Sequence, residues 1–487
     1  MTAVNRRDTC IVGLDLGTTS IKAVAYTPAG ELLASRSAVV KTETGADGRA
    51  VQNPDDVADA AMAVLGHLAA EIAQKEGRIA ALGMSAAMHS LVALDPRDEP
   101  LMPAMTWMDA RPAEVAQALW ASPDGPRLYA RTGTPIHAMA PVCKLAWLRR
   151  ERPDVFARAR RFVSLKEYVW HRLFGEWVCD PAIASATGLF DVQRLDWDPD
   201  ALEFAGVHAD QLSRVVPSDW SQPLASCRLA PRLPLAEGAQ AVVGGSDGVL
   251  ATLAAGAKER EMLVATVGTS LAVRAASRRP VTNASLRTFC YALGEGEYVL
   301  GAPSNAGGIV IDWLVQTLLG HPGEIEQLLA AAGDVQVDDL FALPYVAGER
   351  APFWDEGMSA AWVGLRLHHG PPHMVRAAVE GVLFHTRWLV EEMLGLAEGA
   401  RGVMLAGRLF EQPWIAESAA ALLPVPVWMQ ADADGAAYGA AMMAGRRVGV
   451  DLPMLAVMPG PQAQAVARAD LERRYATWRE LVEKLRA

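Results

Sequence analysis

The sequence predicts two α/β domains with a cleft between them. Short apolar strands alternate with amphipathic helices, and the order of elements that begins near residue 10 begins again near residue 240. A Gly-Thr-Ser turn follows an early strand in each half, at residues 17–20 and 268–270. Alternating strands and helices are typical of layered α/β domains. With 487 residues, the chain is long enough for two such domains and a further helical segment.

The first half is expected to begin with strands, a helix and further strands. Turns rich in glycine, threonine and proline separate the apolar runs. Asn53 is a favourable N-cap and Pro54 suits the first helical position, so we expect a helix from there to about residue 75. The expected strands are 10–16, 21–27, 31–38, 79–84 and one near 91–95.

The second half repeats this order after a domain boundary near residues 246–258. A strand ends at Gly245, and a hairpin surrounds the second Gly-Thr-Ser turn. The last helix is charged and amphipathic, and we expect it to pack on the second domain. The expected strands are 240–245, 261–267, 271–276, 402–406 and 425–430, and the expected helices are 307–319, 371–396, 413–422, 435–446 and 469–486.

Composition and charge exclude several functional classes. Apolar residues make up 51% of the chain and charged residues 21%, which is typical of a folded globular protein. The net charge of −11 argues against a nucleic-acid partner that depends on a global basic field. Five scattered cysteines without a CxxC pair favour a reducing cytoplasm. We find no signal-peptide pattern and no membrane-length apolar run, so no membrane partner is expected.

Two turns have the composition of phosphate-binding loops. The first is Asp15-Leu16-Gly17-Thr18-Thr19-Ser20, and the second is residues 266–270. Glycine lets the backbone approach a phosphate, threonine and serine can donate to its oxygens, and Asp15 can hold Mg²⁺ through water. One such turn alone could be an ordinary strand connection, but one in each half favours a nucleoside triphosphate bound between two lobes. The chain has no Walker loop and no dinucleotide-type GxGxxG turn.

Asp247 follows an apolar strand within Gly244-Gly245-Ser246-Asp247-Gly248, at the expected meeting point of the lobes. A carboxylate there could orient a hydroxyl and accept its proton during phosphoryl transfer. Taken alone, the same aspartate could equally be a turn residue.

The chain resembles the FGGY carbohydrate kinases, which have an actin-like (ribonuclease H-like) ATPase fold. Residues 139–151 fit the first signature of this family, and residues 360–365 with 373–380 fit the second. The two phosphate-type turns and Asp247 occupy the corresponding places. The resemblance implies a sugar-binding N-terminal domain at 10–246, a nucleotide-binding C-terminal domain at 247–447 and a helical extension at 448–487.

Within this family the chain is most similar to the gluconate kinases. The resemblance implies that Asp247 accepts the proton of the 6-hydroxyl of D-gluconate, with ATP as the donor and 6-phosphogluconate and ADP as products. Substrate would lie near Met88, His89 and Arg111, and Asp15 would help to position Mg²⁺. The residues implied to bind ATP are Thr18, Thr19, Ser20, Lys22, Thr269, Gly308 and Gly407. The segments that carry this similarity are 85–90, 106–111, 131–137, 165–168, 185–188 and 344–352.

The charge of gluconate gives a further expectation. Its carboxylate should need local cations or several donors in a protein of net charge −11. The candidates in the sugar-binding half are His89, Arg111, Arg131, His137, Lys144 and Lys166.

One segment departs from the family pattern. Arg408 follows Gly407 where a second glycine is usual, and Gln412 stands near an expected serine. A large side chain there could clash with the nucleotide or stack on its base. Two alternatives therefore stay open: a kinase of the same family for xylulose, ribulose or glycerol, and an actin-like nucleotide-binding protein without transfer activity. The oligomeric state is also open, with a homodimer among the options.

Overall fold

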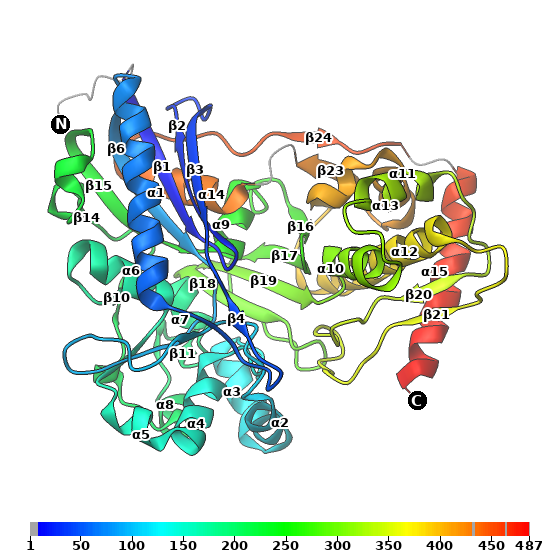
Figure 1. The fold of residues 1–487 in the computed structure, drawn as a ribbon, viewed down its shortest axis with the longest axis horizontal. Coiled ribbons are helices and arrows are strands. Elements are labelled where there is room, and N and C mark those ends of the chain that lie inside the picture. Colours follow the sequence, from blue (N-terminus) through cyan, green and yellow to red (C-terminus); the bar gives the residue numbers. More distant parts are fainter. Residues whose placement is uncertain (1–7, 431–433, 463–464, 487) are drawn as a thin grey trace.

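Two mixed β-sheets form the centres of two α/β domains, and this confirms the predicted fold class. The computed structural model describes residues 8–430, 434–462 and 465–486. Figure 1 shows the sheet of the first domain on the left and that of the second domain towards the right. Among the described residues, no helix is long and apolar enough to span a membrane.

The first sheet contains the three strands expected at the start of the chain. In spatial order its strands are β14 (Ser221–Pro223), β15 (Leu235–Ser246), β6 (Arg78–Ala86), β1 (Thr9–Leu16), β2 (Ser20–Tyr26) and β3 (Leu32–Val39). β1 pairs antiparallel with β2 and parallel with β6, and β6 pairs parallel with β15. The carboxyl ends of β1, β6 and β15 therefore meet at one edge of the sheet.

Helices cover both faces of this sheet. Val12 and Leu14 of β1 join the apolar cluster under α1 (Pro54–Gln74), whereas Ile11 clusters with residues of α14 (Gly435–Arg447). The opposite placement of successive residues is the alternation expected of a buried strand. In Figure 1 the orange α14 lies among the blue strands of the first sheet, although it comes from the other end of the chain.

The contact between α14 and the first sheet requires glycine. A Cβ atom on Gly13 would lie 1.9 Å from the carbonyl oxygen of Ala437, and one on Gly83 would lie 2.0 Å from that of Ala440. On another side of α14, a Cβ on Gly439 would lie 2.1 Å from the carbonyl oxygen of Leu250 in α9 (Asp247–Ala254). These close approaches join the two domains through α9 and α14.

The second sheet repeats the centre of the first. In spatial order its strands are β18 (Phe289–Gly294), β19 (Glu297–Ser304), β17 (Leu271–Ser277), β16 (Met262–Val267), β22 (Gly402–Ala406), β23 (Val427–Gln430) and β24 (Val457–Pro459). β16 pairs antiparallel with β17 and parallel with β22, as β1 does with β2 and β6. The repeated order of elements seen in the sequence therefore reflects a repeated sheet topology.

The structure contains a helix at each predicted segment of the second half, whereas α9 and α11 (Ile325–Gly333) were not predicted. The expected helix 307–319 is α-helical only in α10 (Gly308–Trp313), after which residues Leu314–Leu318 form a π-helical turn. Arg474 of the last helix forms a buried ion pair with Glu380 of α12 (2.6 Å), so this helix packs on the second domain. The other helices are α11 (Ile325–Gly333), α12 (Pro371–Leu396), α13 (Pro413–Leu422) and α15 (Ala465–Arg486).

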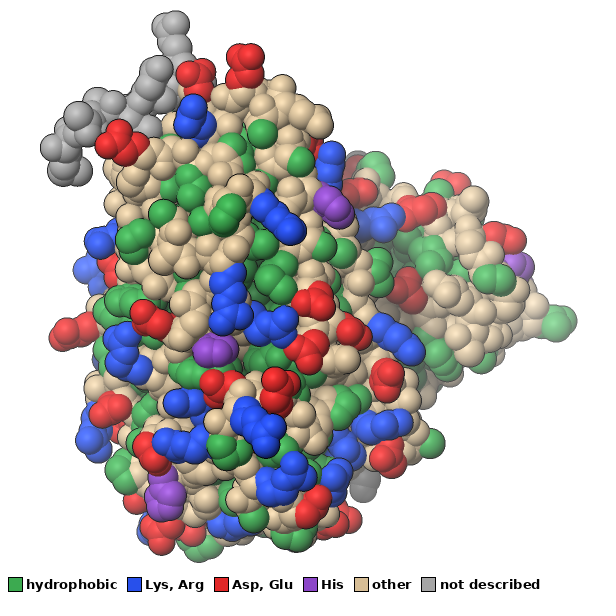
Figure 2. Space-filling view, turned by 60° about the vertical axis from the view of Figure 1, so that its left-hand side comes forward, with side chains coloured by type: hydrophobic (Ala, Val, Ile, Leu, Met, Phe, Trp, Pro, Cys, Tyr) green, Lys and Arg blue, Asp and Glu red, His purple; other side chains and the backbone are tan. Residues whose placement is uncertain are grey.

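A helical insertion between β6 and β15 has no counterpart among the predicted elements. It forms the lower left of Figure 1 and has its own apolar cluster around α4. On the face shown in Figure 2, acidic and basic side chains are interspersed. The helices of the insertion are α2 (Ala113–Ala121), α3 (Asp124–Thr132), α4 (Pro141–Glu151), α5 (Pro153–Arg158), α6 (Leu165–Phe174), α7 (Pro181–Ser185) and α8 (Pro199–Ala205).

The remaining strands are short and lie outside the two main sheets. They pair in twos and threes within the insertion, beside the first sheet and in the second domain. They are β4 (Glu43–Thr44), β5 (Ala50–Gln52), β7 (Val92–Leu94), β8 (Ala104–Met105), β9 (Arg161–Val163), β10 (Val178–Cys179), β11 (Phe190–Asp191), β12 (Asp196–Trp197), β13 (Arg214–Val215), β20 (Phe341–Leu343) and β21 (Ala361–Val363).

Candidate active site

A cavity of about 300 Å³ lies where the two domains face each other. The first domain contributes the turn after β1 and the loops after β6 and β8, and the second domain contributes β17, β18 and the segment after β20. Several predicted site residues line it together. These are Thr18, Thr19, Met88, His89 and Asp247.

Asp247 is the first residue of α9 and directly follows β15, so the end of the first sheet positions its carboxylate. Its Oδ1 accepts a hydrogen bond from the backbone amide of Gly248 (2.6 Å). Burial raises the pKa of Asp247, while the nearby charge of Arg274 lowers it. A carboxylate at a cavity wall with a raised pKa can accept a proton from a bound hydroxyl.

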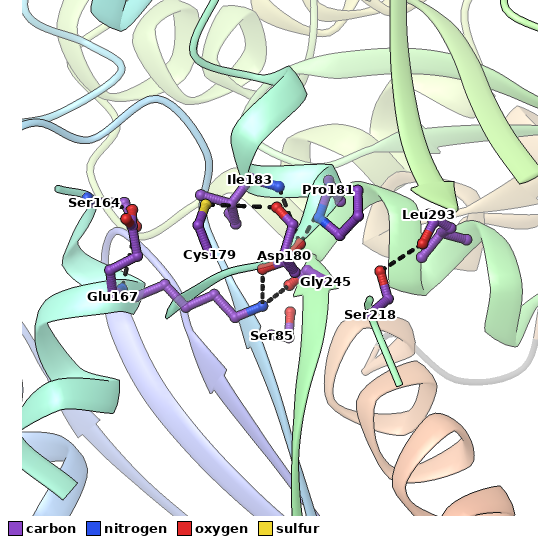
Figure 3. Close-up of polar contacts among 12 residues, drawn as sticks. Ser85, Ser164, Glu167, Cys179, Asp180, Pro181, Ile183, Ser218, Gly245 and Leu293 are labelled. Carbon is purple, nitrogen blue, oxygen red and sulfur yellow. Dashed lines mark hydrogen bonds and ion pairs between the residues drawn. The ribbon is translucent and has the colours of Figure 1, made fainter. Parts of the chain in front are cut away.

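A buried ion pair holds the end of β15 in place. The Nζ atom of Lys166 donates to the carbonyl oxygen of Gly245 (2.7 Å) and to Oδ2 of Asp180 (2.8 Å). Figure 3 shows this junction, in which Asp180 also caps α7 by accepting from the amides of Ala182 and Ile183. Lys166 therefore binds the backbone two residues before Asp247, at Gly245. Lys166 itself does not line the cavity.

Asp15 lies at the end of β1, and the charge of Asp247 acts on it. Its Oδ1 accepts a hydrogen bond from the hydroxyl of Ser85 (2.7 Å). Burial, reinforced by the charge of Asp247, raises the pKa of Asp15 to about 7. Lys22, which was predicted to bind phosphate, forms an ion pair with Asp434 at 2.5 Å. Asp15 therefore belongs to an acidic environment in which a cation would be favourable.

The turn after β1 is hydrogen-bonded to Trp107, which lies in the 106–111 segment that carries the resemblance to gluconate kinases. The indole Nε1 of Trp107 donates to Oγ1 of Thr18 (3.0 Å), and the side chain of Gln52 donates to the carbonyl oxygen of Thr18 (2.7 Å). Thr18 and Thr19 line the cavity, whereas Ser20 is the first residue of β2 and does not. The turn is therefore held by side chains from two other segments.

His89 faces the cavity in a fully bonded, neutral form. Its Nδ1 donates to the carbonyl oxygen of Ala186 (2.7 Å), which leaves Nε2 to accept from the hydroxyl of Tyr291 (3.3 Å). Burial, together with the nearby charge of Lys144, lowers the pKa of His89 to about 3. The ring consequently links the two domains and carries no charge for a substrate carboxylate.

The other first-domain cations expected near the sugar have partners within the protein. Arg111 makes a bidentate contact with Asp109, with Nη2 to Oδ2 at 2.5 Å and Nε to Oδ1 at 2.8 Å, and stacks over Trp147. It does not line the cavity. The remaining pairs are Arg131 with Asp198 and Asp200, His137 with Glu356, and Lys144 with the carbonyl oxygens of His89 and Thr106.

A second cavity, of about 640 Å³, lies within the second domain. Thr269, Gly308 and Gly407 all line it, so the structure brings together these three predicted nucleotide-binding residues. Gly407 has φ +124°, and a Cβ there would lie 2.1 Å from the carbonyl oxygen of Val267. Only glycine fits this position without a shift of the backbone.

Arg408 does not fill this cavity in the way that its position in the sequence suggested. Its guanidinium forms an ion pair with Glu326 of α11 (3.3 Å), and its side chain is 80% exposed. Gln412 donates to the same carboxylate (3.2 Å). Arg408 and Glu326 both line the cavity, so this exposed ion pair forms part of its wall.

The second Gly-Thr-Ser turn separates the two cavities. Gly268 and Thr269 line the larger one, and Ser270 lines the smaller one. The amide of Gly308 donates to the carbonyl oxygen of Gly268 (2.7 Å), which fixes the turn to the start of α10. The turn therefore contributes to the walls of both cavities, and Asp247 lines the smaller one.

Among the cavity residues that were not assigned a role from the sequence, three have large polar side chains: Arg274, Tyr291 and Arg350. Arg350 lies in the 344–352 segment, which was used only as a family marker. Arg274 interrupts the apolar strand β17, and a charge in such a strand is a signal that sequence reading could have used. Tyr291 gives no such signal, because tyrosine is common in strands.

Comparison with known proteins agrees with this geometry. Residues 10–254 match the N-terminal domain, and residues 263–448 the C-terminal domain, of the FGGY family of carbohydrate kinases. A gluconokinase from Bacillus subtilis is 37% identical over 388 residues, covering 77% of this chain and 75% of that protein. A gluconate kinase structure from Lactobacillus acidophilus has a TM-score of 0.90 at 28% identity, covering 98% of both chains. A ligand-bound xylulose kinase from the same species also has a TM-score of 0.90 at 28% identity, covering 98% of this chain and 99% of that one.

Proposed function

The chain belongs to the FGGY family of carbohydrate kinases, and we propose that it is a gluconokinase. It would transfer the γ-phosphoryl group of ATP to the 6-hydroxyl of D-gluconate, giving 6-phosphogluconate and ADP. The observation that carries this proposal is the placement of Asp247 at the wall of one cavity, beside the turn that borders a second. The curated gluconokinase relative supports the choice of sugar.

In this mechanism the nucleotide occupies the larger cavity. Gly407 and Gly308 leave room for the adenosine, and Thr269 with Thr18 and Thr19 donates to the phosphates. Ser20 and Lys22 flank the first turn from β2. The substrate chain lies in the smaller cavity against Met88, His89 and Trp107, with its 6-hydroxyl facing Asp247.

Asp247 orients the 6-hydroxyl and accepts its proton as the oxygen attacks the γ-phosphorus. In phosphoryl transfer the transition state is loose, so the base acts mainly by positioning and takes the proton late. Because the cavity is enclosed by both domains, closure around the substrate excludes water that would otherwise compete as acceptor.

The acidic surroundings of Asp15 fit a magnesium ion that accompanies ATP. Carboxylate oxygens are ligands that Mg²⁺ prefers, and burial beside Asp247 already disfavours the charged form of Asp15 in the absence of a cation. We assign Asp15 to hold the ion, directly or through water. When bound, Mg²⁺ would neutralise charge on the phosphates.

The decisive experiment is a coupled ADP-release assay with Mg·ATP and a panel of acceptors. We expect turnover on D-gluconate to exceed that on xylulose, ribulose and glycerol. Preference for xylulose would favour a second candidate function, that of a xylulose kinase, which the equal TM-score of the xylulose kinase structure supports. Bound ATP without turnover on any acceptor would contradict the kinase proposal.

A further inference from the structure

One arginine of the second domain stands between the two cavities. Arg274, on β17, lines the smaller cavity, and its Nη1 atom donates to the hydroxyl of Thr266 (3.2 Å). Thr266, in β16, lines the larger cavity. The guanidinium of Arg274 therefore borders the proposed acceptor cavity and is one hydrogen bond away from the proposed nucleotide cavity.

The same guanidinium lies against the residue that follows the proposed base. A Cβ atom on Gly248 would lie 2.9 Å from Nε of Arg274 and 3.2 Å from its Nη2, so the absence of a side chain there makes room for the arginine. The backbone amide of Gly248 in turn donates to Oδ1 of Asp247 (2.6 Å). These distances place Arg274 at the end of the acceptor cavity where transfer takes place in the proposed mechanism.

The charge of Arg274 is not matched by an ion pair. Across the described ranges, no carboxylate lies within ion-pair distance of its guanidinium, and Asp247 acts on it only through its charge at longer range. Neither Nε nor Nη2 has a hydrogen-bond partner among these residues, and of the two only Nε is shielded from solvent. A buried guanidinium is unfavourable unless an anion compensates it, so this one suits an anionic ligand.

Two anionic groups of the proposed substrates could meet this guanidinium: the carboxylate of gluconate and the γ-phosphoryl group of ATP. When the 6-hydroxyl of gluconate faces Asp247, the carboxylate lies at the opposite end of a six-carbon chain. The γ-phosphoryl group, by contrast, must come within bonding reach of the 6-hydroxyl and therefore beside Asp247. Position thus favours the phosphoryl group, and the same argument holds for a neutral sugar as acceptor.

We propose that Arg274 is a catalytic residue that binds the γ-phosphoryl group during its transfer. This inference rests on the proposed function and adds a residue to its mechanism. As the bond between O6 and phosphorus forms, the bond from phosphorus to the bridging oxygen of ADP breaks, and Asp247 takes the proton of the hydroxyl. Arg274 keeps its own protons and donates to the phosphoryl oxygens, where its charge offsets their repulsion by the carboxylate of Asp247.

The kinetic test measures Arg274→Gln and Arg274→Lys with gluconate and saturating Mg·ATP. We expect Arg274→Gln to lower kcat by about 10²–10³-fold, as the loss of one preorganised donor to developing charge does, with little change in the KM for gluconate. Arg274→Lys keeps the charge without the planar fork and should recover part of the loss. A rise in the KM for gluconate at unchanged kcat would mean that Arg274 binds the sugar acid, and would overturn the proposal.

A binding measurement gives a second readout that needs no turnover. ADP with aluminium fluoride mimics a phosphoryl group in transfer, so wild type should bind ADP more tightly when aluminium fluoride and gluconate are both present. Arg274→Gln should lose about 10- to 100-fold of this gain, because it lacks a charged donor to the mimic, and should bind ADP alone as wild type does. An equal gain in both proteins would overturn the proposal, and so would weaker binding of ADP alone with a lower unfolding temperature, which would show a structural role.

The pH dependence of kcat separates contact with the phosphoryl group from an effect on Asp247 alone. The charges that act with Asp247 are those of Arg274 on β17, Lys166 on α6 and Asp15 on β1. Removal of Arg274 would raise the pKa of Asp247, so a role limited to this carboxylate predicts that the deficit of Arg274→Gln disappears as the pH is raised. A deficit that persists at high pH supports the contact, and one that disappears overturns it.

The matched control is Arg279→Gln, which removes an exposed arginine two residues after the end of β17 that pairs with Glu398. It should leave kcat and both binding measurements unchanged. A loss in this control equal to that in Arg274→Gln would show that the effect is not specific to the cavity, and would overturn the proposal.

Failure of the gluconate proposal gives a different result. If wild type acts on another acceptor, gluconate is the wrong substrate, and the same measurements are made with that acceptor. A fall in kcat of Arg274→Gln then supports the role of Arg274, and an unchanged kcat overturns it. If wild type transfers phosphate to no acceptor, both the proposed function and the role of Arg274 are overturned.

Discussion

The basic residues around the smaller cavity differ between the two domains. On the first-domain side, Lys166 and Arg111 have carboxylate partners, and Lys144 donates to two backbone carbonyls. On the second-domain side, Arg274 and Arg350 reach the cavity without an ion-pair partner among the residues that the structure describes. The first set is bound within the protein away from the cavity, and the second set lines the cavity and donates to Thr266 and to the carbonyl oxygen of Ser304.

This difference shows why a basic residue near a motif is weak evidence for ligand binding. A basic side chain can attract an anionic ligand only when no carboxylate of the protein already neutralises it. Whether such a carboxylate lies nearby depends on residues that are far away in the sequence. Lys166 and Asp180 are close in sequence, but Arg350 is near Trp107 only because the domains face each other.

Substitution of Asp247, the proposed base, should have the largest effect. We expect Asp247→Asn to lower kcat by about 10²–10⁴-fold, because a positioned general base contributes about that much, with smaller changes in ligand binding. The measurement is ADP release at saturating gluconate and ATP. Asp451→Asn is the control, since Asp451 is 83% exposed. Turnover of Asp247→Asn close to that of wild type would exclude Asp247 as the base.

The structural role of the buried first-domain lysine can be tested by substitution of Lys166. We expect Lys166→Met to destabilise the protein by about 3–5 kcal/mol, because it leaves the buried charge of Asp180 unpaired. Lys166→Met combined with Asp180→Asn should recover most of this loss. Denaturant unfolding measures both, with the exposed Lys258→Met as control. A selective rise in the KM for gluconate without loss of stability would instead make Lys166 a ligand residue.

The neutral state of His89 predicts a dependence of stability on pH. Its pKa of about 3 lies below the ordinary value of 6.5, so between these values the unfolded chain binds a proton that the native protein does not. The stabilisation is complete above pH 6.5 and is lost towards pH 3, by up to about 1.4 kcal/mol per pH unit.

His89→Asn tests this expectation, because asparagine tolerates φ +67° and does not titrate. The variant should be less stable than wild type at pH 7, and the difference should shrink as the pH falls. Urea unfolding at several pH values measures it, with the exposed His208→Asn as control. A constant difference across this range would contradict a neutral, buried His89.

The smallest effect is expected at Arg408, beside the larger cavity that we propose for the nucleotide. Arg408→Ala removes an exposed ion pair, and such pairs contribute about 0–1 kcal/mol, so the KM for ATP should change by less than about fivefold. Gly407→Ala should be far more damaging, because its Cβ would collide with Val267. A large loss of ATP affinity in Arg408→Ala would show that the arginine contacts the nucleotide.

Much of the fold was predictable because it depends on local pattern. The strands around both Gly-Thr-Ser turns and the helix at Pro371–Leu396 follow from apolar periodicity and from proline at a helix start. The helical insertion between β6 and β15 was not predicted. The division of the helix after Gly308 into an α-helical and a π-helical part was also missed, because that departure is decided by packing and not by local propensity.

The candidate site was predictable to a different extent in its two cavities. Thr269 was predicted from the composition of its turn, and Gly308 and Gly407 from the family resemblance; the structure places all three at one cavity. Met88 and His89 reach the acceptor cavity as expected, whereas Arg111 turns towards Asp109 and Trp147. Side-chain direction in a loop is decided by its partners, and sequence spacing does not specify them.

The sequence by itself determined the two-domain α/β class, the two glycine turns and the position of Asp247, because strand period and turn chemistry act over a few residues. Only the tertiary structure decided which charges are available. The apposition of two domains pairs Tyr291 with His89, brings Arg350 over Trp107 and leaves its Nε without a partner in the described part of the chain. The physical reason is that an electrostatic role depends on distance and burial, which arise when residues hundreds of positions apart are packed together.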